Sequence, residues 1–169
     1  MLAACPDGAA PELAAIAAAA SVDLVWQGEG SLGSRMQRLI QRSVAAGQAA
    51  IVLGADTPDL PLPYVAAAAA ALGRAGAVIG PSSDGGYYLI GAAGVCPPVF
   101  ELDAEWGSRE VLQETLVRLR RARVCVTALP AWRDVDDAEG LAQLSSRMAG
   151  GGCALTATRR VLAGLDLAG

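Results

Sequence analysis

Three short acidic segments follow apolar runs along this chain. They are Gly54–Asp59 (GADTPD), Ser83–Gly86 (SDGG) and Arg133–Asp137 (RDVDD). In open α/β sheets, ligands bind in the crevice beyond the carboxyl ends of the strands. Carboxylates brought there by separate loops can converge on a divalent cation, and Mg²⁺ suits such a set because it takes hard oxygen ligands. The segments therefore predict a divalent-cation site at one edge of a sheet.

Most of these acidic residues also have a structural explanation. Asp59 and Asp84 stand in sequences that are typical of turns. Asp137 suits a helix N-cap, and Arg133 could form an exposed ion pair with the aspartate beside it. Asp56 directly follows an apolar run of strand length and is the hardest to explain in this way. The functional hypothesis therefore depends on the order and spacing of the segments.

The residue types that are missing restrict the chemistry further. The 169 residues contain no His, Lys or Asn, so Arg supplies all 13 basic side chains. This excludes Ser-His-Asp and Cys-His catalysis, His-ligated zinc, Schiff bases and the lysine of a P-loop. Any catalysis must use carboxylates, arginines, hydroxyls, backbone amides or a metal held by oxygen ligands.

The charge restricts the partners. A formal net charge of −4 opposes a nucleic acid or an anionic membrane as the main partner, because both require a basic face. One basic cluster near the end of a predicted helix complements the helix dipole or, as the alternative, binds phosphate. Its members are Arg118, Arg120, Arg121 and Arg123. With no membrane-spanning run, no signal-peptide pattern and four scattered cysteines, we expect a cytoplasmic protein.

Apolar runs alternate with helical patterns, which indicates an α/β domain. Strands are expected at Leu2–Ala4, Leu24–Trp26, Ala49–Gly54, Ala77–Gly80, Gly86–Gly91 and Val124–Ala128. Helices are expected at Ala10–Ala20, Ser34–Ala46, Pro63–Arg74, Ser108–Ala122, Asp137–Met148 and Thr156–Leu165. Ser108 and either Asp136 or Asp137 are expected as N-caps, and Ala49–Gly54 as a central parallel strand buried on both faces. We expect residues 1–149 to form the main domain and residues 150–169, which begin with a triple glycine, to form its helical tail.

Five motifs occur in a fixed order. They are Gly28–Met36 (GEGSLGSRM), Gly54–Leu60 (GADTPDL), Gly80–Gly91 (GPSSDGGYYLIG), Trp106–Ser108 (WGS) and Arg133–Asp137 (RDVDD). From about Met1 to Leu144, this order resembles the bacterial GT-A-fold transferases grouped as DUF2064, also called transferase 1 associated with radical-SAM/selenodomain proteins. That family is similar to the molybdenum-cofactor and phospholactate guanylyltransferases and, more distantly, to nucleotide-diphospho-sugar transferases. The resemblance implies a GT-A three-layer sandwich with a mostly parallel sheet.

The resemblance also implies roles for single residues. Asp56 matches a catalytic aspartate that binds Mg²⁺ (or Mn²⁺), and Asp134 and Asp136 match a late D-x-D that completes the metal site. Asp84 matches a catalytic residue that orients the acceptor. The residues implied to bind nucleotide or acceptor are Gly28, Gly30, Gly33, Arg35, Gly85, Gly86 and Trp106. Glycines suit such loops because the backbone can approach a ligand closely, and amides at a helix N-terminus favour anions.

The chain departs from the family pattern at its start. Members begin with a strand and a Gly-rich loop that carries a Lys-Thr-Arg-like element, and this sequence starts after it. We therefore expect a truncated GT-A-like domain that lacks the first strand, which would lie in the middle of the sheet. Unpaired strand edges would follow. A misassigned start, a fragment and a shortened relative all remain open explanations.

Three functions remain after this reasoning. The first is Mg-dependent transfer of a nucleotidyl or glycosyl group from a nucleotide or nucleotide-sugar donor to a small-molecule acceptor. The alternative is a catalytically silent relative that binds a nucleotide or sugar phosphate, with a homo-oligomer left open. A purely structural interpretation, in which the acidic loops are turns and caps, leaves the ordered motifs unexplained. Replacement of Asp56 by Ala distinguishes the first two, because only an enzyme has turnover to lose.

Overall fold

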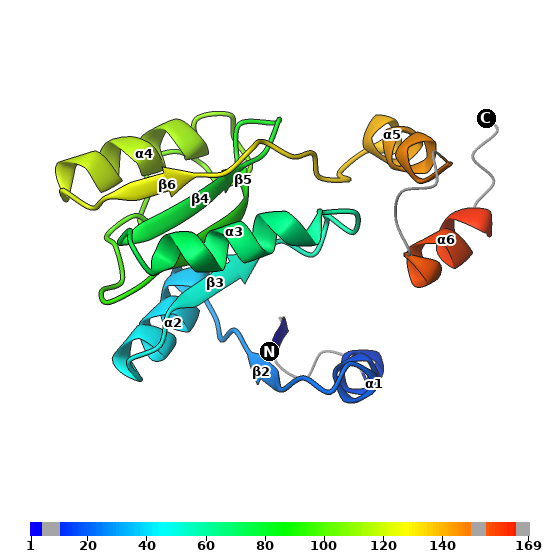
Figure 1. The fold of residues 1–169 in the computed structure, drawn as a ribbon, viewed down its shortest axis with the longest axis horizontal. Helices are drawn as coiled ribbons and strands as arrows, with labels where there is room; N and C mark the ends of the chain where they lie inside the picture. Colours follow the sequence, from blue (N-terminus) through cyan, green and yellow to red (C-terminus); the bar gives the residue numbers. More distant parts are fainter. Residues whose placement is uncertain (5–10, 150–154, 165–169) are drawn as a thin grey trace.

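The computed structural model describes residues 1–4, 11–149 and 155–164 (Figure 1). The strands are β1 (Leu2–Ala4), β2 (Leu24–Trp26), β3 (Ala50–Leu53), β4 (Ala77–Pro81), β5 (Tyr87–Ala92) and β6 (Val126–Ala128). The helices are α1 (Pro11–Ala19), α2 (Leu32–Ala45), α3 (Leu62–Leu72), α4 (Val111–Arg121), α5 (Ala138–Ala149) and α6 (Thr156–Ala163). Each expected element is therefore present, with ends that differ by a few residues. The expected glycine break at 150–152 lies outside the described residues.

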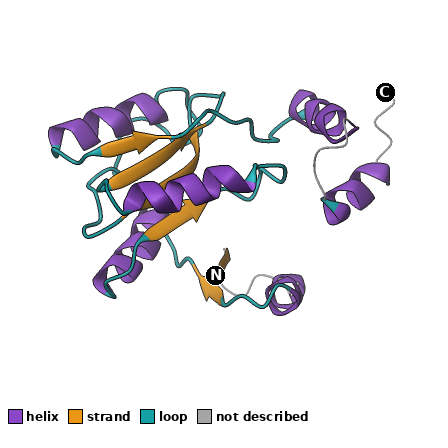
Figure 2. Ribbon diagram, viewed as in Figure 1, coloured by secondary structure: helices purple, strands orange, loops and turns teal. Residues whose placement is uncertain are grey.

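The described strands form two sheets rather than one (Figure 2). β1 pairs with β2 in parallel, and the larger sheet has the order β3-β5-β4-β6. β5 runs antiparallel to both of its neighbours, whereas β6 is parallel to β4. Consequently β3, β4 and β6 all run in one direction, as expected for a mostly parallel sheet. Their carboxyl ends lie at the same edge of the sheet, on the side from which the chain leaves for α5 (Figure 1).

The larger sheet is the middle of three layers. One hydrophobic cluster joins the sheet to α2 and α4; its buried members include Met36, Ile40, Ile90, Phe100 and Leu119. A second cluster joins the opposite face to α3; it includes Ala68, Leu72, Val78, Tyr88 and Leu89. Side chains of neighbouring strand residues point to opposite faces, so β4 and β5 contribute to both clusters. The expected three-layer sandwich is confirmed.

The expected central position and complete burial of β3 are both wrong. β3 is an edge strand of its sheet and pairs only with β5 among the described strands. It is partly buried, and Leu53 is 44% exposed, so this strand is not central and buried on both faces. β4 fills that position instead, with Ala77, Val78 and Ile79 fully buried. A uniformly apolar run of four to six residues does not reveal which neighbours a strand will have.

The N-terminal loop of α2 is built from short-range polar contacts. Ser31 is the N-cap, and its Oγ accepts a hydrogen bond from the Ser34 amide at 3.2 Å. Ser34 was predicted as the start of this helix, so the observed start lies two residues earlier. Met36, Leu39 and Ile40 then recur at helical spacing and are buried under the sheet. This helix is amphipathic, as its sequence predicts.

The start of α4 differs from the expectation in its cap. Glu110 takes the N-cap position and makes no side-chain cap bond. Ser108, the expected cap, lies two residues earlier, and its buried Oγ has no hydrogen-bond partner among the described residues. The turn before α4 is instead held by backbone bonds, including one from the Leu112 amide to the Gly85 carbonyl at 3.0 Å. A tertiary contact therefore replaces the local cap.

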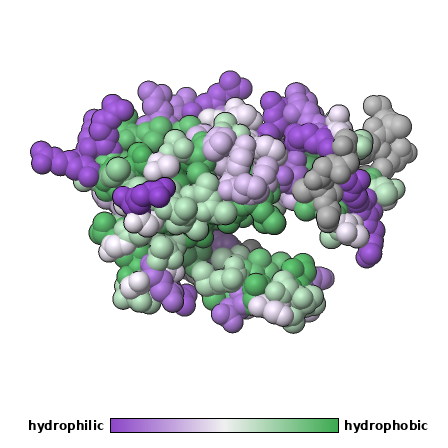
Figure 3. All heavy atoms as spheres, viewed as in Figure 1, coloured by the Kyte–Doolittle hydropathy of each residue, from purple (hydrophilic) through white to green (hydrophobic). Residues whose placement is uncertain are grey.

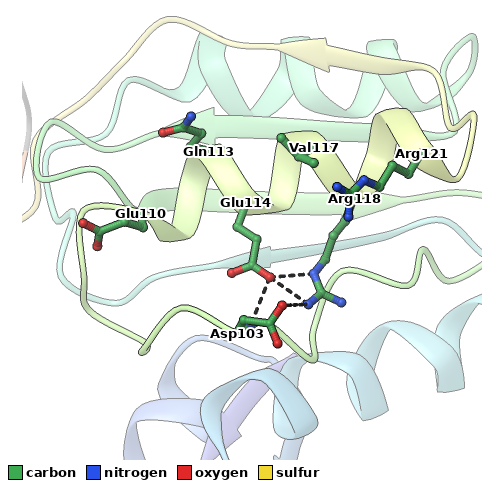
Figure 4. Close-up of a pocket in the computed structure, with 7 residues that line it drawn as sticks. All are labelled: Asp103, Glu110, Gln113, Glu114, Val117, Arg118 and Arg121. Atoms are coloured by element: carbon green, nitrogen blue, oxygen red, sulfur yellow. Dashed lines mark hydrogen bonds and ion pairs between the residues drawn. The ribbon is translucent and has the colours of Figure 1, made fainter.

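Glu114 fixes the loop that precedes α4 (Figure 4). Its two carboxylate oxygens accept hydrogen bonds from the backbone amides of Asp103 at 2.9 Å and Ala104 at 2.7 Å. Arg118 contacts the same carboxylate at 2.7 Å and also Asp103 at 3.0 Å. The two backbone amides, followed by Arg118, lower the pKa of Glu114 to about 2. Arg118, in the arginine-rich last turns of α4, therefore has a structural role.

The surface is divided by polarity. Hydrophilic residues gather over the arginine-bearing end of α4 and along α5 and α6, and apolar colours are frequent over α1 and β2 (Figure 3). Trp26 and Ile16, in β2 and α1, are 42% and 55% exposed. Among the described helices, none has the length and apolar character needed to cross a membrane.

Stability should depend on the charge of Glu114. Because its folded pKa is lowered, its contribution is complete above the unfolded pKa of about 4.3 and is lost as pH falls toward 2. Urea midpoints of the wild type and Glu114→Gln should therefore differ at pH 7 and converge as pH falls through this window. A constant difference across the window would show that the carboxylate charge is not what holds the loop. Exposed Glu101→Gln is the control and should change nothing.

Candidate functional site

Three loops meet at the carboxyl ends of β3, β4 and β6. They comprise residues 54–61, 82–86 and 129–137. The Val135 amide donates to the Asp56 carbonyl at 2.9 Å, which joins the first loop to the third. Ser82 forms a bridge with Trp132 and donates its Oγ to Asp134 Oδ2 at 2.7 Å, which joins the second to the third. The acidic segments found in the sequence therefore lie together, as predicted.

Asp84, Asp134 and Asp136 form the centre of this site. Each offers a carboxylate oxygen, and these three oxygens all lie within 4.8 Å of one another. With Mg–O distances of 2.0–2.1 Å, opposite ligands of an octahedron are about 4.1 Å apart. Only one of the three pairs can be opposite, and neighbouring ligands are about 2.9 Å apart, so the carboxylates must close toward a shared cation by roughly 1–2 Å, with waters in the remaining positions. Asp84 and Asp136 are exposed and Asp134 is half-buried, so side-chain rotation can supply this change.

The neighbouring carboxylates disfavour the charged form of Asp136. Its pKa is raised, first by burial and then by the negative charges of Asp134, Asp56, Asp84 and Asp137. A bound cation would relieve this repulsion. The donor set, hard carboxylate oxygens that repel one another when empty, fits Mg²⁺ or Mn²⁺.

Asp56 lies beside the three-carboxylate group and is not a member of it. Its Oδ1 lies over the backbone of Gly54, 2.5 Å from where a Cβ at that position would be. The structure thus groups Asp84 with Asp134 and Asp136, where we expected Asp56 as the third metal ligand. Asp56 remains close enough to raise the pKa of Asp136. Its exposed carboxylate is therefore an outer member of the acidic site.

Gly85 and Gly86 shape the turn that presents Asp84. The Gly86 amide donates to Asp84 Oδ1 at 2.9 Å, which fixes the carboxylate against its own turn. Gly85 has φ +100°, and a Cβ there would lie 2.5 Å from the Arg109 carbonyl oxygen. Only glycine meets both conditions without strain. The Gly85 backbone thus lies against Arg109, just before α4, and its expected approach to a ligand stays a prediction.

The predicted residues of the first glycine motif have mainly structural contacts. Arg38 donates to the Gln27 carbonyl, and its Nη2 donates to the Glu29 carbonyl at 2.8 Å; these two residues flank Gly28. Arg35 Nη1 donates to Gln27 Oε1 at 3.1 Å, and Arg35 Nε is buried without a hydrogen-bond partner in the described part of the chain. Gly30 lies next to the Ser34 side chain. The loop is preorganised by its own helix, and a nucleotide contact for it stays a prediction.

Gly33 and Trp106 contact each other within the fold. A Cβ at Gly33 would overlap the Phe100 carbonyl and lie 2.7 Å from Trp106 Cζ2. Trp106 also meets Tyr87 edge to face, with ring centroids 6.2 Å apart. Gly33 therefore permits the close packing of α2 against the 100–106 segment. A substrate role for Trp106 stays a prediction.

Asp59 does more than organise a turn. Its carboxylate is 6% exposed and accepts from Trp132 Nε1 at 3.2 Å and from Arg147 Nε at 2.6 Å. The Arg147 guanidinium lies over the Trp132 ring, 5.8 Å from its centroid. This network connects the β3–α3 loop, the β6–α5 loop and α5. Trp132 adjoins the RDVDD motif and could have been singled out from sequence, whereas nothing local distinguishes Arg147.

The remaining charged residues of the RDVDD segment, Asp137 and Arg133, make local structural contacts. Asp137 Oδ1 accepts from the Gly140 amide at 2.7 Å, which confirms it as the cap of α5. Arg133 pairs with Glu139 at 3.6 Å rather than with the neighbouring aspartate. Both side chains are largely exposed, so this pair contributes little to stability.

Comparison with known proteins agrees with this geometry. The model of a family described as uncharacterized proteins conserved in bacteria, DUF2064, matches residues 1–108. The chain belongs to this family. The match includes Asp56 and Asp84 and ends before Asp134 and Asp136. The predicted recognition is confirmed.

A solved structure supports the fold. It is a crystal structure from Desulfovibrio desulfuricans G20 of a protein provisionally described as a nucleotide-diphospho-sugar transferase. It shares 34% sequence identity with this chain, covers 92% of this chain and 69% of its own, and has a TM-score of 0.79. The GT-A-like fold class is thereby confirmed. None of the curated proteins matches this DUF2064 chain.

Replacement of Asp59 by Asn should destabilise the protein. The change leaves Arg147 without its charged partner, and breaking a buried pair costs about 3–5 kcal/mol. Arg147 is 33% exposed and retains some hydration, so we expect about 2 kcal/mol in urea unfolding. Exposed Asp23→Asn should stay within about 0.5 kcal/mol. A loss for Asp59→Asn as small as that of the control would show that the network does not anchor the loops.

Proposed function

We propose that this protein is a divalent-cation-dependent transferase of the nucleotidyl- or glycosyl-transferase type that acts on a small-molecule acceptor. The observation that carries the proposal is the convergence of Asp84, Asp134 and Asp136 within 4.8 Å at the carboxyl ends of the strands. Ligands of open α/β sheets bind at this edge. The similar protein from Desulfovibrio desulfuricans G20, with its transferase description, supports the same type of reaction.

The roles of the residues follow from their positions. Asp84, Asp134 and Asp136 would hold the Mg²⁺ or Mn²⁺, which supplies charge neutralisation and Lewis acidity at phosphate oxygens. Ser82 donates to Asp134 and orients its carboxylate. Gly86 does the same for Asp84 through its amide. Asp56, outside the group, would accept a proton or hydrogen bond from an acceptor hydroxyl.

A catalytically silent relative is the second candidate. Contacts around the Gly28–Arg35 loop favour it, because Arg35 donates to Gln27 and Arg38 donates to Glu29. Asp56→Ala distinguishes the two functions once a turnover assay exists. For the enzyme, turnover is lost while the exposed position leaves the fold intact. For a silent relative, neither the wild type nor the variant has turnover.

Metal binding is the first test of the proposal. Titration of Mn²⁺ followed by electron paramagnetic resonance should show one site, and Asp134→Asn and Asp136→Asn should each weaken it at least about tenfold, because affinity depends on the number of charged ligands. Both variants should remain folded, since neither side chain is fully buried. Asp23→Asn, an exposed aspartate in another part of the chain, is the matched control. Equal Mn²⁺ affinity in all four proteins would overturn the metal assignment.

The donor can be identified by thermal stability. A panel of nucleoside triphosphates and nucleotide sugars is measured with and without Mg²⁺. A ligand at about 100 times its Kd stabilises the folded state by about 2.7 kcal/mol, which gives a clear shift. The proposal predicts a Mg²⁺-dependent shift that is lost in Asp136→Asn. A shift that persists in this variant would place the nucleotide elsewhere.

A further inference from the structure

A cavity adjoins the acidic site and is lined by a different kind of residue. Its volume is about 270 Å³, and it is lined by Ser83, Ala131, Trp132, Arg133 and Arg147. Pockets for drug-sized ligands are about 300–1,000 Å³, so this cavity suits one end of a small molecule. None of its lining residues was predicted to bind substrate.

The cavity and the acidic group share their supporting backbone. Ser83 directly precedes Asp84, and Arg133 directly precedes Asp134. The Ser83 amide donates to the Trp132 carbonyl at 3.1 Å, which holds these two walls together. A molecule that occupies the cavity therefore contacts the same two backbone segments that carry Asp84 and Asp134.

Arg147 is fixed in place, yet one of its donor atoms lacks a partner. Asp59 and the Trp132 ring hold its guanidinium, and the hydrogen bond to Asp59 uses Nε. Nη2 is buried with no hydrogen-bond partner among the described residues. A buried donor without a partner is unfavourable, and a small movement toward an anionic ligand would give Nη2 an acceptor.

Arg133 supplies a second cation that a ligand can recruit. Its Nη1 is 3.6 Å from Glu139 Oε1, which is longer than a hydrogen bond. The same glutamate oxygen accepts from Gln143 at 2.9 Å. Because the Glu139 side chain is 75% exposed, an anion in the cavity can replace this weak pair at little cost.

We propose that the cavity bounded by Trp132, Arg133 and Arg147 binds the anionic group, phosphate or carboxylate, of the small-molecule acceptor. Paired guanidinium groups suit such oxygens because their N–H donors match them in geometry. The Trp132 ring and Ala131 contact the carbon part of the molecule. The assignment of this ligand as the acceptor rests on the proposed transferase function; the anion site itself does not.

The tryptophan indoles provide a direct readout. The chain has three tryptophans, Trp26, Trp106 and Trp132, and so three indole N–H resonances in a ¹⁵N-labelled sample. The Trp132 resonance is assigned from its loss in Trp132→Phe. Inorganic phosphate, acetate and uncharged glycerol are titrated at constant ionic strength in EDTA. We expect phosphate or acetate to shift the Trp132 resonance saturably, whereas glycerol and the Trp26 resonance give no such response.

Matched variants test the residues. Arg133→Gln should weaken binding of the anion by up to about fivefold, since an exposed charge pair contributes up to about 1 kcal/mol. Glu139→Gln removes the charged partner of Arg133 and should tighten binding of the anion. Arg147→Lys keeps the charge and tests the guanidinium fork, with folding checked by the same spectrum. Arg74→Gln removes an exposed arginine at the far end of α3 and should have no effect.

The outcomes separate this proposal from the proposed function. A saturable shift with either anion, weakened by Arg133→Gln and not by Arg74→Gln, supports the site and names the group that it takes. The proposal is overturned if neither anion shifts Trp132, or if Arg133→Gln and Arg74→Gln bind alike. Because EDTA removes metal from the experiment, loss of Mn²⁺ binding in a separate titration would reject the metal site and leave this result standing.

Discussion

Attachment of residues 129–137 to the ends of the sheet is the constraint on which the rest of the site depends. β6 is short, and parallel pairing with β4 ends at Ala128. Beyond it, the segment is held by the Ser82–Trp132 bridge, by the amide of Val135 on the Asp56 carbonyl, and by Ser82 on Asp134. Without these bonds, Asp134 and Asp136 would lie on an unsupported loop, far from a fixed Asp84. Side-chain and backbone hydrogen bonds therefore do what strand pairing does elsewhere in the sheet.

The same segment also brings opposite charges close without cancelling them. α5 begins at Ala138, directly after the acidic motif, so the positive end of its dipole lies beside Asp136 and Asp137. That field helps hold these carboxylates, where burial, followed by mutual repulsion, raises the pKa of Asp136. On the other side, Asp59 binds Arg147 and fixes it against Trp132. The buried aspartate thus has a positioning role, while the exposed aspartates keep their oxygens available for a ligand.

The sequence predicted the elements and the meeting of the acidic loops because both follow from local patterns. Apolar runs located the strands, and the shared direction of β3, β4 and β6 brought three loops to one edge. The failures concern tertiary contacts. Ser108 has the chemistry of a cap, but the Gly85 carbonyl takes over at the start of α4. Asp84 joins Asp134 and Asp136 because the Gly85–Gly86 turn directs its carboxylate, while Asp56 lies over Gly54 and its role as a metal ligand stays a prediction. Arg147 lies 88 positions from Asp59, and no local pattern encodes that pair.

The charge balance couples the two proposed ligands. Asp56, Asp84, Asp134 and Asp136 place four carboxylates around the site, and the nearby Arg147 and Arg133 are already paired with Asp59 and Glu139. An anion that binds in the cavity without a cation meets this negative field, which weakens its binding without preventing it, because Arg133 can exchange its exposed partner Glu139 for the ligand. A divalent cation held by the carboxylates would lower that field, so each ligand should strengthen binding of the other, with Asp134 and Arg133 as adjacent residues that serve one ligand each.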